Sequence, residues 1–374
     1  MRKNILLIFG GESVEHDISV ITALQTLKNI DSIYNVVPIY IAKNGTWLTA
    51  ENMQDVSIYH DFMKKGKKVK FVTLISGKPY IALRKNNKYS KFINVNFALL
   101  CTHGKHGEDG ALQGMLYNSH IPYSSCDVKS SAIIMDKIFM KDVLLSRKLP
   151  YLPYVSLVFE EYVKNKDRYI NQIVSKLKFP LILKPANLGS SIGIKICYEK
   201  KDIKNYIDFC FRFDNRILVE KYLPDITEYN CACVHMNNDL KISSIQKVEK
   251  SEGIYSFEDK YLKEGVKKVD KIDKSLTLKI KNLTEKVYRA FGCYGVIRVD
   301  FIYDNVMQKL YVNEINSIPG SMAFYLFKDL RFKDLIDCLI EEGLERFKNE
   351  QFVSAYDSDA LTLFEKIDFT SKQK

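Results

Sequence analysis

Apolar residues along the chain fall into short continuous blocks, which predict strands that are buried on both faces. The first block is residues 5–9 (ILLIF), and similar blocks occupy residues 34–41 and 92–103. After the first block a glycine turn leads into a segment whose apolar residues recur near helical spacing, at Ile18, Ile21, Ala23, Leu24 and Leu27. A strand, a helix and a second strand in this order predict a parallel sheet flanked by helices.

Two helices are expected between residues 103 and 150. The first begins just after the acids Glu108 and Asp109, which suit a helix start, and the second is closed by Pro150. We place the first domain boundary at the second of these helices, near Asp136.

From residue 179 onward the pattern changes to short β-type runs joined by Gly and Asn. This texture predicts an antiparallel meander rather than a doubly wound sheet. Pairs of strands are expected over residues 216–236 and 293–316, and the second pair turns at Asp304 and Asn305.

The length of 374 residues predicts two or three domains. The protein is expected to be compact, because 46% of its residues are apolar and 12% are aromatic. The formal charge is +11, but the densest basic run, residues 64–70, lacks the interleaved aromatic residues of a nucleic-acid surface. No segment is long enough to span a bilayer, and the first apolar stretch is too short for a signal core. The eight cysteines include no CxxC pair. We therefore expect a reduced, cytoplasmic protein without a nucleic-acid or membrane partner.

Polar residues continue an apolar strand near the end of the last strand pair. In an extended strand one face would carry Leu310, Val312, Glu314 and Asn316. Asp300 comes from the partner strand, so two carboxylates and an amide oxygen could hold magnesium and leave positions open for phosphate oxygens. An ordinary strand end whose acids pair with Lys or with Arg298 explains the same residues equally well. Arg298 could also hold a developing negative charge beside the metal.

A Gly/Ser loop follows the strand predicted at residues 181–184. Its backbone amides and the hydroxyls of Ser190 and Ser191 could surround phosphate oxygens, while Lys184 neutralises their charge. The lysine precedes the glycines, so this is not the Walker pattern, and a plain turn is the alternative. Residues 219–223 (VEKYL) leave a strand where backbone groups could meet an adenine edge.

Acidic residues follow the first strand, where a dinucleotide-binding turn would present bare amides. The charges of Glu12 and Glu15 would repel a pyrophosphate, so this glycine turn is not expected to bind a dinucleotide.

With these segments in view, the chain resembles a D-alanine:D-alanine ligase, a member of the ATP-grasp superfamily. The resemblance covers residues from about 4 to 326, and eight motifs occur in the order found in the family. In this sequence they read GGESVEHDIS, HGKHGEDGALQG, SSAIIMDK, LKPANLGSSIGI, VEKYL, DKYL, RVDF and NEINSIPG.

The resemblance implies a nucleotide site and a metal site. The phosphates of ATP would be contacted by Lys137, Lys184, Ser191 and Lys260. The adenine would be contacted by Glu220, Lys221 and Leu223, and the ribose by Glu228. Two magnesium ions, for which manganese could substitute, would be held by Asp300, Glu314 and Asn316.

The resemblance also implies a site for the amino acids. Glu15 would bind the ammonium of the first D-alanine, in a hydrogen-bonded network with Ser190 and Tyr261. His103 would lie near the same substrate.

In the family mechanism a D-alanine carboxylate attacks the γ-phosphate of ATP and gives an acyl phosphate, which the amine of the second D-alanine then attacks. Arg298 and the amide of Gly320 would stabilise the oxyanion. These steps gather anionic charge and need water to be excluded, which suits cationic residues and a lid carrying Lys260 and Tyr261.

The chain departs from the family pattern at two places. Tyr325 lies near the position where the family commonly has a Ser that contacts the carboxylate of the second substrate, although Ser321 could compensate. Ser125 replaces a usual Gly. Tyr261 is retained, which favours an amine over a hydroxyl as the nucleophile.

We therefore predict an α/β protein with the ATP-grasp fold. An N-terminal parallel-sheet substrate domain (1–136) would precede a central ATP-grasp subdomain (137–222) and a catalytic domain (223–374), and the last two would clasp ATP. The predicted function is the joining of two D-alanines for peptidoglycan precursor synthesis, in a cytoplasmic homodimer. The alternatives are the same chemistry with D-Ser, D-lactate or another second substrate, a nucleotide-binding regulator without turnover and, last, a basic nucleic-acid protein.

Overall fold

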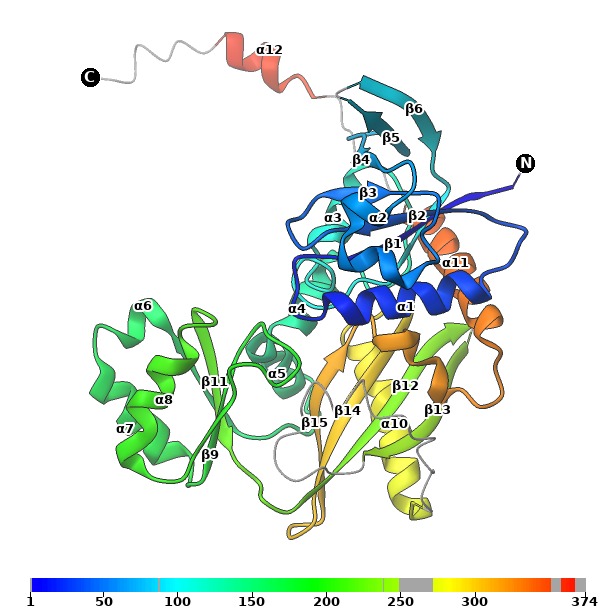
Figure 1. The fold of residues 1–374 in the computed structure, drawn as a ribbon. Helices are drawn as coiled ribbons and strands as arrows, with labels where there is room; N and C mark the ends of the chain where they lie inside the picture. The colour runs from blue at the N-terminus through cyan, green and yellow to red at the C-terminus, as the bar shows by residue number, and fades with distance from the viewer. Residues whose placement is uncertain (1, 87, 238, 249–271, 351–357, 367–374) are drawn as a thin grey trace.

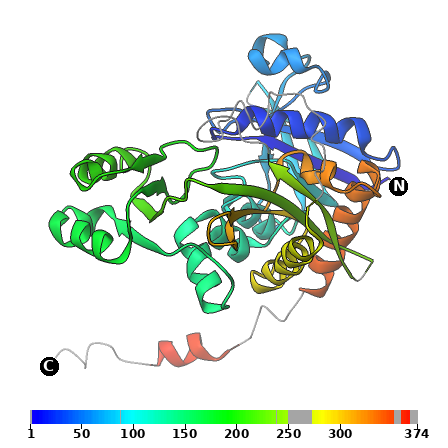
Figure 2. The same cartoon turned by 90° about the horizontal axis from the view of Figure 1, so that it is seen from below.

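Three sheets follow one another along the chain, each with its own helices (Figure 1). The structure is a computed structural model that describes residues 2–86, 88–237, 239–248, 272–350 and 358–366. We call the three parts the N-terminal, central and C-terminal units. Figures 1 and 2 show the central unit set to one side of the other two, which lie against each other.

The N-terminal sheet has seven strands in the order β6-β5-β4-β3-β2-β1-β7. Its strands are β1 (Asn4–Gly10), β2 (Asn35–Ile41), β3 (Trp47–Thr49), β4 (Lys70–Leu74), β5 (Tyr80–Lys85), β6 (Lys88–Asn94) and β7 (Phe97–Leu100). Its helices are α1 (His16–Asn29), η1 (Val56–His60), α2 (Phe62–Lys65), α3 (Ala111–Asn118) and α4 (Val128–Met135). As predicted, β1 is parallel to β2, and it is also parallel to β7.

The predicted parallel pairing does not extend to the strands between β2 and β7. The polar stretch after β2 forms β3 to β6, and each of these pairs antiparallel with its neighbour. The single strand predicted over residues 92–103 is also divided, because β6 ends at one edge of the sheet and β7 lies at the other. Short connections allow antiparallel neighbours, whereas parallel strands need a crossover, and the segment after β2 contains only short helices.

The face of α1 that was expected to be buried is only partly so. Ile18 is buried, but Ile21 is 40% exposed, and the hydroxyl residues Ser19, Thr22 and Thr26 take the inner positions. Each hydroxyl has a hydrogen-bond partner within the protein. The hydroxyl of Ser19, for example, donates to the carbonyl oxygen of Cys101 and accepts a hydrogen bond from the amide of Gly10. Because their polar atoms are satisfied, these side chains can occupy the core without the cost of lost hydration.

The central unit is built on a four-stranded antiparallel sheet, but it is not a meander, because β11 lies between β8 and β9. Its strands are β8 (Tyr154–Val158), β9 (Leu181–Pro185), β10 (Lys195–Cys197) and β11 (Arg216–Lys221). Its helices are α5 (Lys137–Ser146), α6 (Phe159–Tyr162), α7 (Lys166–Lys176), η2 (Lys200–Asp202) and α8 (Ile203–Cys210).

The long helix predicted to end at Pro150 is in fact two helices, α4 and α5, which separate at Asp136. This residue has φ −85° and ψ 109°, and its carboxylate accepts the amides of Ile138 and Phe139. Asp136 is thus the N-cap of α5, and the cap stops α4 because the two conformations are incompatible. The predicted domain boundaries, near residue 136 and at residue 222, remain predictions.

The C-terminal sheet is antiparallel with the order β13-β12-β14-β15. Its strands are β12 (Ile226–Met236), β13 (Asp239–Val248), β14 (Val296–Asp304) and β15 (Lys309–Asn316). Its helices are α10 (Lys274–Ala290), η3 (Gly320–Leu326), α11 (Phe332–Asn349) and α12 (Ala360–Glu365). The predicted β14–β15 hairpin is confirmed, but the strand pair expected over residues 216–236 is wrong, because β11 and β12 belong to different sheets. In the described part of the chain no helix combines the length and apolar character that a membrane crossing requires.

A buried arginine on α11 joins the N-terminal and C-terminal units. Arg346 donates hydrogen bonds to the carbonyl oxygens of Ser125 (2.7 Å) and Tyr123 (3.0 Å). Its guanidinium also lies 4.7 Å from the ring centroids of both Tyr123 and Tyr294. The largely buried guanidinium therefore satisfies two backbone acceptors.

We predict that Arg346→Met lowers the free energy of unfolding by about 3 kcal/mol, because two buried carbonyl groups lose a charged donor. Denaturant titration of the full chain would measure the change. Arg289→Met is the control, since Arg289 forms an exposed ion pair with Glu285 on α10 and should cost less than about 1 kcal/mol. Equal losses for the two variants would contradict the role given to Arg346.

Candidate active site

The β14–β15 hairpin brings the predicted metal ligands together, with a change of register that sequence did not show. Asp300 lies opposite Glu314, but the next pair is Phe301 with Val312, so a β-bulge sits between them. The bulge reverses the alternation of faces. Val312 consequently packs in the core of the C-terminal unit with Ile315. The shared face expected for Leu310, Val312, Glu314 and Asn316 is therefore wrong.

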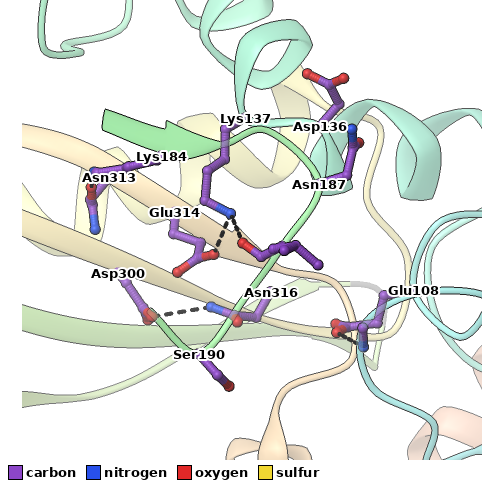
Figure 3. A network of polar contacts seen from close by, with 12 residues as sticks. Glu108, Asp136, Lys137, Lys184, Asn187, Ser190, Asp300, Asn313, Glu314 and Asn316 are labelled. Carbon is purple, nitrogen blue, oxygen red and sulfur yellow. Dashed lines mark hydrogen bonds and ion pairs between the residues drawn. The ribbon is translucent and has the colours of Figure 1, made fainter. Parts of the chain in front are cut away.

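On the other face of β15, Glu314 and Asn316 line a cavity, beside Asp300 of β14. Arg298 forms two bonds to the carboxylate of Asp300 (2.6 and 2.8 Å), and the amide of Asn316 donates to the same group (3.1 Å). Lys137 lies at the start of α5, and its ammonium is 3.2 Å from the carboxylate of Glu314 (Figure 3). Both acids are thus ion-paired, as the ordinary interpretation of this strand end expected.

These side chains supply ligand types that magnesium prefers, namely two carboxylates and one amide. In the present arrangement the amide nitrogen of Asn316 faces Asp300, so the amide would have to turn to offer its oxygen to an ion. Among the described residues no three His, Cys, Asp or Glu side chains are grouped for a metal ion. The amide oxygen of Asn316 would therefore be needed as the third ligand from the protein.

The Gly/Ser loop after β9 is held from two sides. The ammonium of Lys137 donates to the carbonyl of Leu188 (2.6 Å), and the hydroxyl of Ser190 donates to the carboxylate of Glu15 (2.6 Å). Ser190 and Ser191 both have positive φ, at 54° and 60°. The expected contact between Glu15 and Ser190 is present, and it links the start of α1 to the central unit.

A second group of charges lies buried between α5 and β11. Glu220 is fully buried, and its two oxygens contact Lys141 at 2.6 Å and Lys184 at 2.8 Å. Burial alone would raise the pKa of Glu220, but the two ammonium groups outweigh it and lower this pKa to about 2. Lys141 was missed in the sequence, although it lies one helical turn after Lys137 and so shares its face of α5.

On the N-terminal side, Glu108 lines the cavity and is half-buried, and His103 is buried. Burial and the neighbouring Glu15 raise the pKa of Glu108 to about 8, and its oxygens accept the amides of Gly104 and Ile318, both at 2.8 Å. His103 uses both ring nitrogens within the protein, and burial lowers its pKa to about 4. Glu108 was predicted only as an acid near a helix start.

The cavity thus gathers residues from all three units. It is lined by Glu15, Glu108, Ile134, Met135, Lys137, Gly189, Ser190, Arg298, Glu314, Ile315, Asn316 and Ser317. Six of these are predicted site residues, namely Glu15, Lys137, Ser190, Arg298, Glu314 and Asn316.

Other predicted residues lie away from this lining. Lys221 is exposed where β11 ends, Leu223 follows it and Glu228 is on β12. Tyr325, in η3, is 50% exposed. Lys260 and Tyr261 lie outside the described residues.

Comparison with known proteins assigns the family. A model described as D-ala D-ala ligase N-terminus matches residues 4–126, and one described as D-ala D-ala ligase C-terminus matches residues 143–341. The chain belongs to the D-alanine:D-alanine ligase family. A relative named D-alanine–D-alanine ligase from Thermosipho melanesiensis is 38% identical over 361 residues, which are 94% of this chain and 96% of the relative.

Solved structures of the family share the ATP-grasp fold of this ligase, which confirms the predicted fold. The D-Ala:D-Ser ligase VanG from Enterococcus faecalis is 26% identical with a TM-score of 0.79, over 92% of this chain and all of that one. A D-alanine–D-alanine ligase from Bacillus anthracis, complexed with ATP, is 25% identical with a TM-score of 0.66, over 93% of this chain and 99% of that one.

We predict that His103 makes this ligase less stable in acid. Its pKa falls from 6.5 in the unfolded chain to about 4 in the fold, so below pH 6.5 the unfolded state binds the extra proton. The free energy of unfolding should therefore fall by about 3 kcal/mol between pH 6.5 and pH 4 on account of this residue. In His103→Asn this contribution to the dependence of the unfolding free energy on pH should vanish.

Denaturant titrations across this pH range would compare the slopes of the two proteins. His106→Asn is the control, because its side chain is 50% exposed, and it should keep the slope of the wild type. If the unfolding free energy of His103→Asn depends on pH as steeply as that of the wild type, the conclusion that the His103 ring is buried and neutral is contradicted.

Proposed function

We propose that this protein is an ATP-dependent ligase that joins two D-alanines into D-alanyl-D-alanine through an acyl-phosphate intermediate. The observation that supports this most directly is the meeting of Glu15, Lys137 and Glu314 in one cavity, each from a different unit. An acid suited to an ammonium, a lysine suited to phosphate and a carboxylate suited to a metal ion are the groups that this reaction needs.

The nucleotide would enter beside the central unit. Lys137 and Lys184 would meet its phosphates, and both now contact carboxylates, Glu314 and Glu220, at 3.2 and 2.8 Å. These contacts keep the ammonium groups in place before the anion arrives. Ser191 and Lys260 would contact the γ-phosphate. The end of β11, with Glu220 and Lys221, and the following Leu223 would contact the adenine, and Glu228 of β12 would contact the ribose.

Magnesium would be held by Asp300, Glu314 and Asn316. When bound, the metal supplies positive charge that neutralises phosphate oxygens and lets a carboxylate approach them. Lys137 would then exchange its carboxylate partner for a phosphate. Arg298, held by Asp300 in a two-bond pair, is oriented to face negative charge that develops on the reacting carbonyl.

The first D-alanine would place its ammonium on Glu15, whose carboxylate is oriented by the hydroxyl of Ser190. Its carboxylate would then point toward the phosphates, with Arg298 and the amide of Gly320 receiving the oxyanion. Tyr261 would complete the network around Glu15 and Ser190. Fixing both ends of so small a substrate lowers the entropic part of the barrier.

The identity of the second substrate is the part of the proposal that needs the closest test. Tyr325 is half-exposed in η3, where the family commonly has a Ser, and Ser321 would take over its contact to the carboxylate. D-Ser is a specific alternative, because the structurally similar VanG is named a D-Ala:D-Ser ligase. We further propose that the enzyme is a cytoplasmic homodimer serving peptidoglycan precursor synthesis.

Mass analysis of products tests the function. The full chain would be incubated with ATP, magnesium and D-alanine, alone or with D-Ser or D-lactate. D-alanyl-D-alanine as the main product, with one phosphate released per dipeptide, supports the proposal. If product forms only when D-Ser or D-lactate is added, that acid is the second substrate. If no product forms in any mixture, a regulator without turnover is favoured.

We predict that Glu314→Gln lowers kcat at least about 100-fold, because the change removes one metal-binding charge at constant shape. Phosphate release at saturating ATP and D-alanine, with magnesium raised stepwise, would measure the effect. Glu285→Gln, on the exposed face of α10, is the control and should match the wild type. Full activity of Glu314→Gln at any magnesium concentration would rule out the metal role.

A further inference from the structure

The turn that leaves β15 is conformationally strained. Ser321, Met322 and Ala323 have φ values of 52°, 51° and 50°, so three consecutive residues with side chains adopt the left-handed region. Residues other than glycine rarely do this, and they persist there only where the surroundings hold them. Met322 and Ala323 are buried, and Gly320 directly precedes Ser321.

The N-terminal unit holds this turn at three points. The carboxylate of Glu108 accepts the amide of Ile318 (2.8 Å), and Nδ1 of His103 lies 2.7 Å from the carbonyl oxygen of the same residue. The third point is the amide of Ser321, which donates to the hydroxyl oxygen of Thr22 (3.0 Å). These contacts bracket Pro319 and Gly320.

The protons of this network can be placed in only one consistent way. A carbonyl oxygen only accepts, so Nδ1 of His103 carries the proton that meets Ile318. The buried ring is neutral, which leaves Nε2 as an acceptor. Thr22, at 3.0 Å from Nε2, must therefore donate its hydroxyl proton to His103, and its oxygen is free to accept the Ser321 amide.

Thr22 also has a defined relation to Glu15. Glu15 is the N-cap of α1 and Thr22 lies seven positions later, about two helical turns, so the two side chains project from the same side of the helix. Glu15 is at the N-cap and reaches the cavity, whereas Thr22 reaches the strained turn. One rigid helix thus fixes the distance between the ammonium site and Gly320.

We propose that Thr22 is a positioning residue for the ligation: by accepting the Ser321 amide while donating to His103, it holds the Gly320 amide where the oxyanion forms. This inference rests on the proposed function, which gives the Gly320 amide its role. Thr22 does not touch a substrate. Valine has the shape of threonine but supplies neither the donor nor the acceptor, whereas serine supplies both.

The experiment compares Thr22→Val, Thr22→Ser and Thr26→Val with the wild type in the full chain. Thr26 is a matched control, because it is also fully buried on α1 and its hydroxyl donates to the carbonyl of Thr22 without contacting the turn. Steady-state rates of dipeptide formation would give kcat and the KM values for ATP and D-alanine. Hydrogen exchange followed by mass analysis would report on residues 317–326.

We expect Thr22→Val to lower kcat about 30-fold or more with the KM for ATP within about twofold of the wild type. Amide exchange in residues 317–326 should be faster in this variant alone. Thr22→Ser should retain kcat within about threefold, and Thr26→Val should match the wild type even if its unfolding midpoint falls.

Two results would overturn the inference while the proposed function stands. One is a kcat of Thr22→Val equal to that of Thr26→Val, and the other is an equal loss in Thr22→Ser. If the wild type forms no dipeptide, the proposed function fails first, and the role of Thr22 in ligation fails with it.

Discussion

The structure depends on charged side chains finding polar or oppositely charged partners where its three units meet. A charge removed from water is tolerated only next to a partner, and here the partners come from separate parts of the chain. Lys137 of the central unit contacts Glu314 of the C-terminal unit, and Ser190 of the central loop contacts Glu15 of the N-terminal unit. The contacts that align the units therefore involve the same groups that the proposed substrates would engage. Substrate binding would therefore exchange one partner of each charged side chain for another, and no charge would be left unpaired inside the protein.

The N-terminal unit contributes more to this arrangement than an amino-acid site. Its helix α1 lies between its own sheet and the strained turn after β15, as Figure 1 shows. Glu108 and His103 reach the same turn from the loop after β7. A conformation that the turn would not adopt alone is thus imposed by a unit more than two hundred residues earlier in the chain. Geometry in the C-terminal unit consequently depends on the packing of the N-terminal unit against it.

Much of the fold and of the site could be predicted from the sequence. Continuous apolar blocks gave β1, β2 and the β14–β15 hairpin, and six of the predicted site residues line one cavity. The bulge opposite Asp300 could not be predicted, because an extra residue in one strand leaves no trace in an alternating pattern. The buried face of α1 was missed for a different reason. Thr22 and Thr26 look like surface residues until their distant partners are known, and those partners are set by tertiary structure. The break at Asp136, in contrast, could have been predicted, because aspartate is a common N-cap residue. The apolar pattern that runs on through it obscured this.

The buried group of Lys141, Glu220 and Lys184 has a consequence for how the nucleotide is met. Two ammonium groups and one carboxylate sum to a charge of +1, and the group is enclosed by protein between α5 and β11. Mobile ions weaken the field of a surface cluster within about 8 Å at physiological salt, but they cannot enter this interior. A phosphate that lies directly against this group would therefore be held with little weakening by salt, whereas its approach through the solvent is screened as for any charged ligand.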